Sequence, residues 1–188
     1  MRSIKQSFYL VMTLFIFASA HSAYASEFKE IDWIELMPKA DLEALLNPPS
    51  YVTDVEDGSL EDQLANQIQS SPVTMPKDRY QQALVSQEVV AEMDGKMVRL
   101  PGFIVPLEYK SEQIVTKFFL VPYFGACIHV PPPPPNQIIL VDYPKGLKLE
   151  SIYDPFWLSG KLKVVLTEND VAISSYSLDL KAYELYQE

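Results

Sequence analysis

Five consecutive prolines restrict the fold of this chain more than any other feature of its sequence. They are Pro131, Pro132, Pro133, Pro134 and Pro135. Such a run adopts polyproline II, a stiff rod that rises about 3.1 Å per residue, roughly 16 Å in all. None of these residues can donate a backbone hydrogen bond, so the run cannot be a central strand. It serves either as a rigid strut within the protein or as a preformed docking rod for an aromatic groove on a partner.

Short apolar runs on both sides of the prolines predict a β domain. The expected strands cover residues 89–93, 97–105, 116–121, 137–142, 161–167 and 171–178. Asp94-Gly95 is a strong signal for a hairpin between the first two. Gly102 and Gly160 indicate bulges or bends inside strands. We therefore expect a mainly β fold, a small OB-like β-barrel of about five or six strands, with a small sandwich as the alternative.

The remaining segments predict helices. Apolar residues recur at near-helical spacing over residues 28–47, and Pro38 divides the pattern so that a second helix begins near residues 39–40. A weaker helix is expected over residues 60–68, within a polar linker. A short helix is expected at the C-terminal end, over residues 180–187.

The first 25 residues have the composition of a cleavable secretory signal peptide. Arg2 and Lys5 precede an apolar run, and Ala23 and Ala25 occupy the small-residue positions of a cleavage site. The apolar run is shorter than the roughly 20 residues that span a bilayer, so an uncleaved anchor is the weaker alternative. We expect a periplasmic protein without a membrane anchor after cleavage. The expected organisation is a signal peptide over 1–25, a helical segment and linker over 26–80, and the β-barrel domain over 81–188.

Charge and motif content limit the function classes. The chain has 25 acidic and 15 basic residues, a formal net charge of −10. Loss of Arg2 and Lys5 with the signal peptide would change this charge to −12. Such a surface repels nucleic acid, so no nucleic-acid partner is expected. The sequence has no phosphate-binding loop, dinucleotide fingerprint, HExxH or G-x-S-x-G motif, so an enzyme is the less favoured class.

The single cysteine, Cys127, and His129 form the candidate functional pair. In an extended backbone, residues two positions apart face the same side, so the thiol and the imidazole would project together. Once the signal peptide is removed, His129 is also the only histidine. Thiolate and imidazole are ligands for zinc or copper(I), and zinc is favoured here. Because structural zinc takes four ligands, a carboxylate such as Glu108, Asp142 or Asp154, or a homodimer, could complete the site.

Tyr123 and Phe124 stand just before the pair. They could line the site or, together with the five prolines, bind a partner protein. A third class is a thiol-dependent redox protein or enzyme, because Cys127 and His129 could form a nucleophilic dyad. No particular carboxylate can be identified to orient the imidazole, so we assign no catalytic residues. The structural alternative is that Cys127 and the aromatic residues are ordinary core.

Several of these segments together resemble the bacterial "domain of unknown function 3299" family, found in exported proteins of proteobacteria. The resemblance covers roughly residues 94–178, and Trp33 and Pro38 extend it into the helical part. It rests on the segments at residues 100–108, 121–134, 136–137 and 158–162. It implies no established catalytic residues. It implies a link to ABC-type transport systems, some of them concerned with zinc supply.

These observations lead to one expectation and two alternatives. The expectation is a periplasmic, non-enzymatic accessory protein that binds zinc through Cys127 and His129 and assists a transport or metal-homeostasis system. Its partner would be a transporter component or another periplasmic protein. The first alternative is an interaction scaffold that docks a partner through the proline run, and the second is the thiol-dependent protein.

Overall fold

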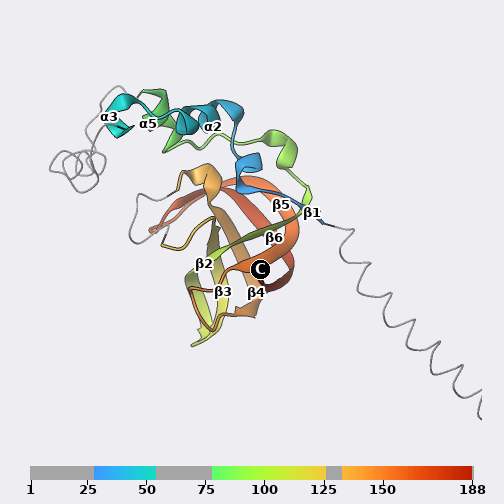
Figure 1. Cartoon of the computed structure of the whole chain (residues 1–188). Coiled ribbons are helices and arrows are strands. Elements are labelled where there is room, and N and C mark those ends of the chain that lie inside the picture. Colours follow the sequence, from blue (N-terminus) through green and yellow to red (C-terminus); the bar gives the residue numbers. More distant parts are fainter. Residues whose placement is uncertain (1–27, 54–77, 126–132, 188) are drawn as a thin grey trace, which may run out of the picture.

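The computed structural model describes residues 28–53, 78–125 and 133–187. The elements in these residues are β1 (Lys29–Glu30), η1 (Trp33–Leu36), α2 (Lys39–Leu46), α3 (Ser50–Thr53), α5 (Arg79–Ala83), η2 (Ala91–Met93), β2 (Met97–Ser111), β3 (Ile114–Val121), η3 (Pro135–Gln137), β4 (Ile139–Lys148), β5 (Phe156–Glu168) and β6 (Ile173–Leu185). The helices α2 and α5 lie together at one end of the strands (Figure 1).

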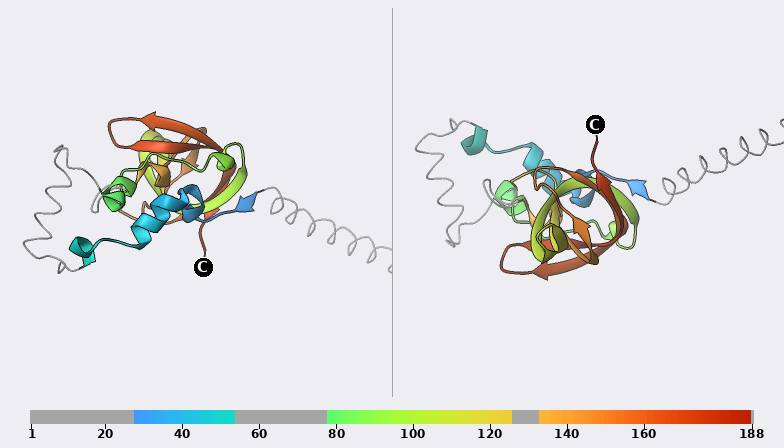
Figure 2. Two further views of the ribbon diagram at one scale, coloured as in Figure 1. Left: turned by 90° about the horizontal axis from the view of Figure 1, so that it is seen from above. Right: turned by 90° about the horizontal axis from the view of Figure 1, so that it is seen from below.

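The strands β2 to β6 form a closed barrel. Their sheet has the order β1-β2-β3-β4-β6-β5, and an additional pairing of β2 with β5 closes it. Strands β4 and β6 are parallel, whereas the other barrel pairs are antiparallel. Seen from above and below, the strands curve around a common interior (Figure 2). This arrangement, with the short β1 added beside β2, confirms the predicted OB-like barrel.

Two glycines lie where the backbones of neighbouring strands approach each other closely. Strand β2 pairs with β5 up to Gly102 and with β3 beyond it. A Cβ at Gly102 would lie 2.7 Å from the carbonyl oxygen of Val121, and a Cβ at Gly160 would lie 2.5 Å from that of Asp179. No side chain fits at either distance, so both strands require glycine. Gly102 thus marks the corner at which β2 exchanges one partner for another.

The barrel interior is filled by the larger of two apolar clusters. Tyr176 is fully buried in it, and its hydroxyl donates to the carbonyl oxygen of Leu36 at 2.9 Å and accepts from the backbone N–H of Val90 at 2.8 Å. Burial raises the pKa of Tyr176. Alternate residues of β3 face opposite sides, so Phe119 and Val121 belong to a second, smaller cluster outside the barrel.

The hairpin predicted around Asp94-Gly95 is wrong in its first strand. Residues 91–93 form the 3-10 turn η2, which directs Met93 into the core. The following strand pairs with β5 and β3 instead. Asp94 accepts a hydrogen bond from the backbone N–H of Val164 at 2.9 Å, and Gly95 turns the chain with a φ of 76°. The dipeptide does make a turn, but the turn joins a 3-10 helix to the barrel.

The predicted C-terminal helix is also wrong, because strand β6 continues to Leu185. Leu185 pairs with Phe156, and Ala182 pairs with Ser159. This ladder, which local sequence does not reveal, overrides the helical preference of the segment. By contrast, the break at Pro38 is confirmed, since Pro38 is the N-cap residue of α2.

Candidate functional site

The candidate pair lies in the connection between β3 and η3. Cys127, His129, Pro131 and Pro132 are outside the described residues, as is the expected helix over 60–68. The chain is described on both sides of the pair, in an outgoing stem over residues 122–125 and a returning stem over residues 133–137. The site is therefore built here from its two stems and from what they contact.

The outgoing stem carries exposed aromatic side chains. Tyr123 and Phe124 are each 40% exposed, and Gly125 follows with a φ of 81°. The ring of Phe124 meets Phe103 edge-on at 6.1 Å and Tyr153 at 4.7 Å between centroids. Tyr153 is 67% exposed. We call Phe103, Phe124 and Tyr153 the aromatic platform.

The strand register explains why these three rings meet. Phe103 is the first residue of β2 that pairs with β3, and its partner is Val121, the last residue of β3. Phe124 follows shortly after that residue. Tyr153 comes shortly before Phe156, the first residue of β5, which pairs with Gly102. Three segments distant in sequence therefore converge at the corner of β2.

The returning stem is packed into the protein. Pro133 and Pro134 are buried, and Pro135 is half-buried at the start of η3. The backbone N–H of Gln137 donates to the carbonyl oxygen of Pro134 at 2.7 Å. Its side-chain amide donates to the carbonyl oxygen of Trp33 at 3.0 Å. This part of the proline run is anchored to the barrel and to the N-terminal segment.

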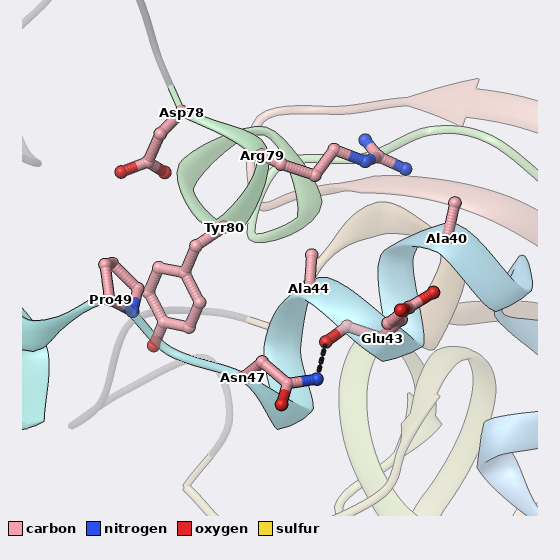
Figure 3. Close-up of a pocket in the computed structure, with 8 residues that line it drawn as sticks. All are labelled: Ala40, Glu43, Ala44, Asn47, Pro49, Asp78, Arg79 and Tyr80. Carbon is pink, nitrogen blue, oxygen red and sulfur yellow. Dashed lines mark hydrogen bonds between the residues drawn. The ribbon is translucent and has the colours of Figure 1, made fainter.

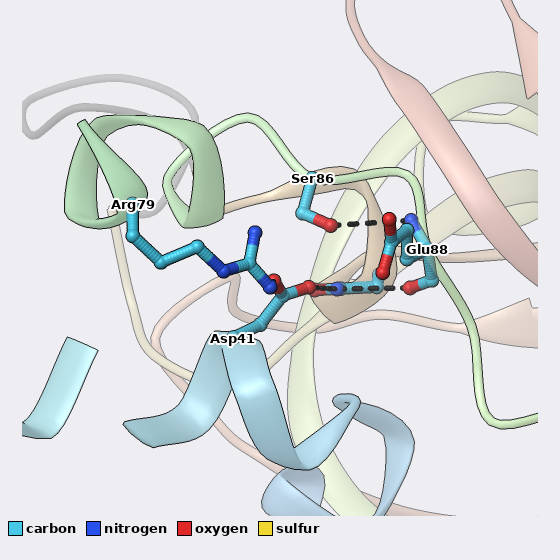
Figure 4. Close-up of polar contacts among 5 residues, drawn as sticks. Asp41, Arg79, Ser86 and Glu88 are labelled. Atoms are coloured by element: carbon cyan, nitrogen blue, oxygen red, sulfur yellow. Dashed lines mark hydrogen bonds and ion pairs between the residues drawn. The ribbon is translucent and has the colours of Figure 1, made fainter. Parts of the chain in front are cut away.

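A buried polar network lies behind the returning stem. Asp41 of α2 is fully buried, forms an ion pair with Arg79 of α5, and accepts from the side-chain amide of Asn136 at 3.3 Å. The same amide donates to the carbonyl oxygen of Glu88 at 3.0 Å. Figure 4 shows Asp41 and Arg79 reaching toward each other from the two helices. The sequence contains no signal for this network, because acidic residues are common in the first turn of any helix.

Glu108 lies elsewhere on the β2–β3 hairpin. It pairs with Lys117, whose ammonium is 3.1 Å from the Glu108 carboxylate, and this hydrogen bond raises the pKa of Lys117. Phe103, at the corner of β2, pairs with Val121 at the other end of the same ladder. Glu108 is exposed, and its carboxylate contacts Lys117. The register of β2 with β3 places it away from the outgoing stem.

An open groove runs between α2 and α5 and has a volume of about 610 Å³. Figure 3 shows the methyl groups of Ala40 and Ala44 turned toward the side of α5. The polar lining includes Glu43, Arg79 and Tyr80. Since Arg79 is already paired with Asp41, its charge is largely neutralised within the protein. The remaining lining residues are Asn47, Pro49 and Asp78.

The described residues contain neither a cluster of metal-ligating side chains nor a membrane-spanning helix. Within that part of the chain, no group of three or more histidine, cysteine, aspartate or glutamate side chains is placed to hold a metal ion. No helix in the same residues is long and apolar enough to cross a membrane. The expected signal peptide over residues 1–25 lies outside them.

Comparisons with known proteins point to a single family. The family model described as "Protein of unknown function (DUF3299)" matches residues 33–185. Among solved structures, the crystal structure of a DUF3299 family protein from Pseudomonas aeruginosa PAO1 is similar, with 33% sequence identity and a TM-score of 0.63. The match covers 86% of this chain and 97% of that one. No match was found among curated proteins.

Proposed function

The chain belongs to the DUF3299 family, and from the geometry of its candidate site we propose that it is an exported, non-enzymatic docking protein. It binds a periplasmic partner protein through the aromatic platform and the stems beside Cys127 and His129. The observation that carries the proposal is the exposed contact between the rings of Phe124 and Tyr153, because Phe124 precedes the only cysteine of the sequence by three residues.

Exposed aromatic rings in mutual contact support a docking role. Isolated apolar side chains on a surface are ordinary, but clustered ones mark interaction sites. Aromatic side chains offer large contact areas at low conformational cost and dominate binding hot spots. The rings of Phe124 and Tyr153 already contact each other, with 4.7 Å between their centroids, so little conformational freedom is lost when a partner binds.

The platform also stands on a rigid base. Phe103 is part of the β2–β3 ladder, and the backbone at the neighbouring Gly102 lies so close to Val121 that no side chain fits between them. On the other side of the candidate pair, Pro133 and Pro134 are buried. The segment with Cys127 and His129 thus leaves from one fixed point and returns to another, which suits a binding segment.

The negative net charge of the chain indicates the kind of partner that it binds. The chain has a formal net charge of −10, and signal-peptide removal would increase its negative charge. Acidic proteins attract basic partners and repel nucleic acid. We therefore assign the platform to a basic, aromatic-binding surface of a periplasmic component, with transport-system components as the first to test.

The test is site-specific photocrosslinking with a photoreactive amino acid in place of Phe124, and with the same residue in place of Tyr109 as a control. Tyr109 is 54% exposed and lies farther along β2. A partner captured from position 124 and not from position 109 is then purified. Its affinity should fall at least tenfold in Phe124→Ala and in Tyr153→Ala. Unchanged affinity in both variants, or no partner captured from position 124, contradicts the proposal.

A second candidate function is zinc binding by Cys127 and His129, favoured by the spacing of two residues between the only cysteine and the only histidine outside the signal peptide. A homodimer would supply two thiolates and two imidazoles. Native mass spectrometry after zinc loading checks this, with Cys127→Ser and His129→Ala as variants and Glu108→Gln as the control. Equal, near-zero zinc occupancy in the wild type and in all variants contradicts zinc binding.

Rapid alkylation of Cys127 in the folded protein would instead favour the thiol-dependent alternative.

A further inference from the structure

We infer that Asp41 is a latch that fastens α2 and α5 to the barrel, and that this helix pair can open while the barrel stays folded. The inference does not depend on the proposed docking function. It concerns a conformational change of the two helices, which contact the returning stem through Asn136.

The first observation is how little apolar surface joins the helix pair to the barrel. The two apolar clusters draw their described members from the strands, η1, η2 and the segments beside them, and neither includes a residue of α2 or α5. In the pair itself, the buried residues are Asp41 and Ala83. Leu46, a residue of α2 with a large apolar side chain, is 71% exposed. Leu42 and Leu45 of α2 are half-buried, so apolar burial contributes to the helix pair, but less than it does to the barrel.

The second observation is that one carboxylate joins three elements. One oxygen of Asp41 contacts the guanidinium of Arg79 from α5, and the other accepts from Asn136 of η3 at 3.3 Å. Asn136 is itself tied to the carbonyl oxygen of Glu88. A buried carboxylate is stable only while such partners remain, so these contacts form or break together.

The third observation is that one buried acceptor of the network has no donor among the described residues. The amide nitrogen of Asn136 faces two acceptors, on Asp41 and Glu88, and this fixes the orientation of its side chain. The amide oxygen of Asn136 is buried and has no hydrogen-bond partner within the described part of the chain. A buried acceptor without a donor weakens the closed state. Regions with few apolar contacts open locally, before the rest of a protein unfolds.

Opening of the latch reaches the returning stem. Asn136 lies in η3, directly after the proline run, and its side chain donates a hydrogen bond to Asp41. When Asp41 moves away, η3 keeps its contact from Gln137 to Trp33 but loses its contact to α2. Movement of the helix pair therefore changes the contacts made by the residue that follows the proline run.

The test is hydrogen–deuterium exchange of the full-length exported protein, resolved by peptide. In Asp41→Ala, exchange should rise at least tenfold in residues 39–46, 79–83 and 135–137, with β3 and β5 unchanged. Asp41→Asn, which keeps an acceptor for Asn136, should give a smaller increase. Glu43→Gln, on the exposed side of the same helix, is the control and should match the wild type.

Two results would overturn the latch. One is unchanged exchange of α2 and α5 in Asp41→Ala. The other is an equal rise throughout the barrel, which would make the helices part of one cooperative unit. If the alanine variant does not fold, the wild type alone decides the matter at low urea concentrations. Amides of α2 should then exchange by an opening that does not expose those of β3, whereas exchange of both only by global unfolding refutes the inference.

Discussion

The barrel and the α2–α5 helix pair are stabilised by different physics. Strands β2 to β6 bury a continuous apolar interior that includes Leu100, Phe118 and Leu158. The helix pair buries a carboxylate, Asp41, and pairs it with Arg79 and Asn136. Apolar burial is non-directional and adds up over many contacts, whereas a buried charge depends on each of its partners.

This difference predicts how each region responds to change. The barrel should tolerate neither a change in the volume of its buried side chains nor a new side chain where two strands lie close together. It should unfold as one unit. The helix pair should tolerate altered apolar side chains and respond chiefly to altered charge. The candidate site lies between the two regions, with the aromatic platform on the barrel and the returning stem in contact with both.

The largest effect is expected from a side chain at Gly160. In Gly160→Val, the Cβ would lie 2.5 Å from the carbonyl oxygen of Asp179, so β5 and β6 must separate. We expect a loss of about 4 kcal/mol or more of unfolding free energy, or failure to fold. Gly125→Ala is the contrast, because a Cβ there meets no atom of the described residues within 4 Å, whereas its φ of 81° is strained for alanine. It should cost about 1 kcal/mol, measured by urea denaturation. Equal losses would contradict the role of strand approach.

A smaller effect is expected from deleting apolar side chains in the two regions. Leu158→Ala leaves a cavity in the barrel interior and should cost about 2–5 kcal/mol. Leu46→Ala, in α2, should change the free energy of unfolding by less than about 0.5 kcal/mol, because its side chain is largely exposed. Chemical denaturation followed by circular dichroism compares them. A large loss for Leu46→Ala would show that the helix pair is held by apolar burial after all.

The smallest of the three effects is expected at Tyr176, where the N-terminal segment is attached to the barrel. Tyr176→Phe leaves the carbonyl of Leu36 and the N–H of Val90 without this partner and should cost about 1–3 kcal/mol at neutral pH. Burial raises the pKa of Tyr176 above the ordinary 10.0. Its contribution is therefore present below pH 10 and is lost as the pH rises through the raised value.

This pH dependence provides the measurement. Denaturation curves of wild type and Tyr176→Phe, collected from neutral to alkaline pH, should converge as the pH rises above 10, because phenylalanine cannot ionise. A constant difference between the two proteins would contradict a raised pKa at this site. The comparison also separates this hydroxyl from the other tyrosines, which both proteins share.

The sequence predicted the barrel better than it predicted the surroundings of the site. Short apolar runs and the glycines Gly102 and Gly160 are sufficient to predict a small closed β structure, because strand-forming residues and sites of close strand approach can be recognised in the local sequence. Tyr123 and Phe124 were identified by their position next to Cys127. Tyr153, which contacts Phe124, cannot be identified from the sequence, because that contact depends on the register of β2 with both β3 and β5.

What the sequence determined by itself is therefore local. The break at Pro38, the backbone conformation of the proline run and the strand-forming apolar runs follow from the properties of single residues and their neighbours. Tertiary structure alone decided that the C-terminal residues extend β6, that Asp41 is buried, and that Phe103, Phe124 and Tyr153 form one platform. The physical reason is that burial, charge pairing and contacts between aromatic rings depend on distant segments, and no single segment encodes its partner.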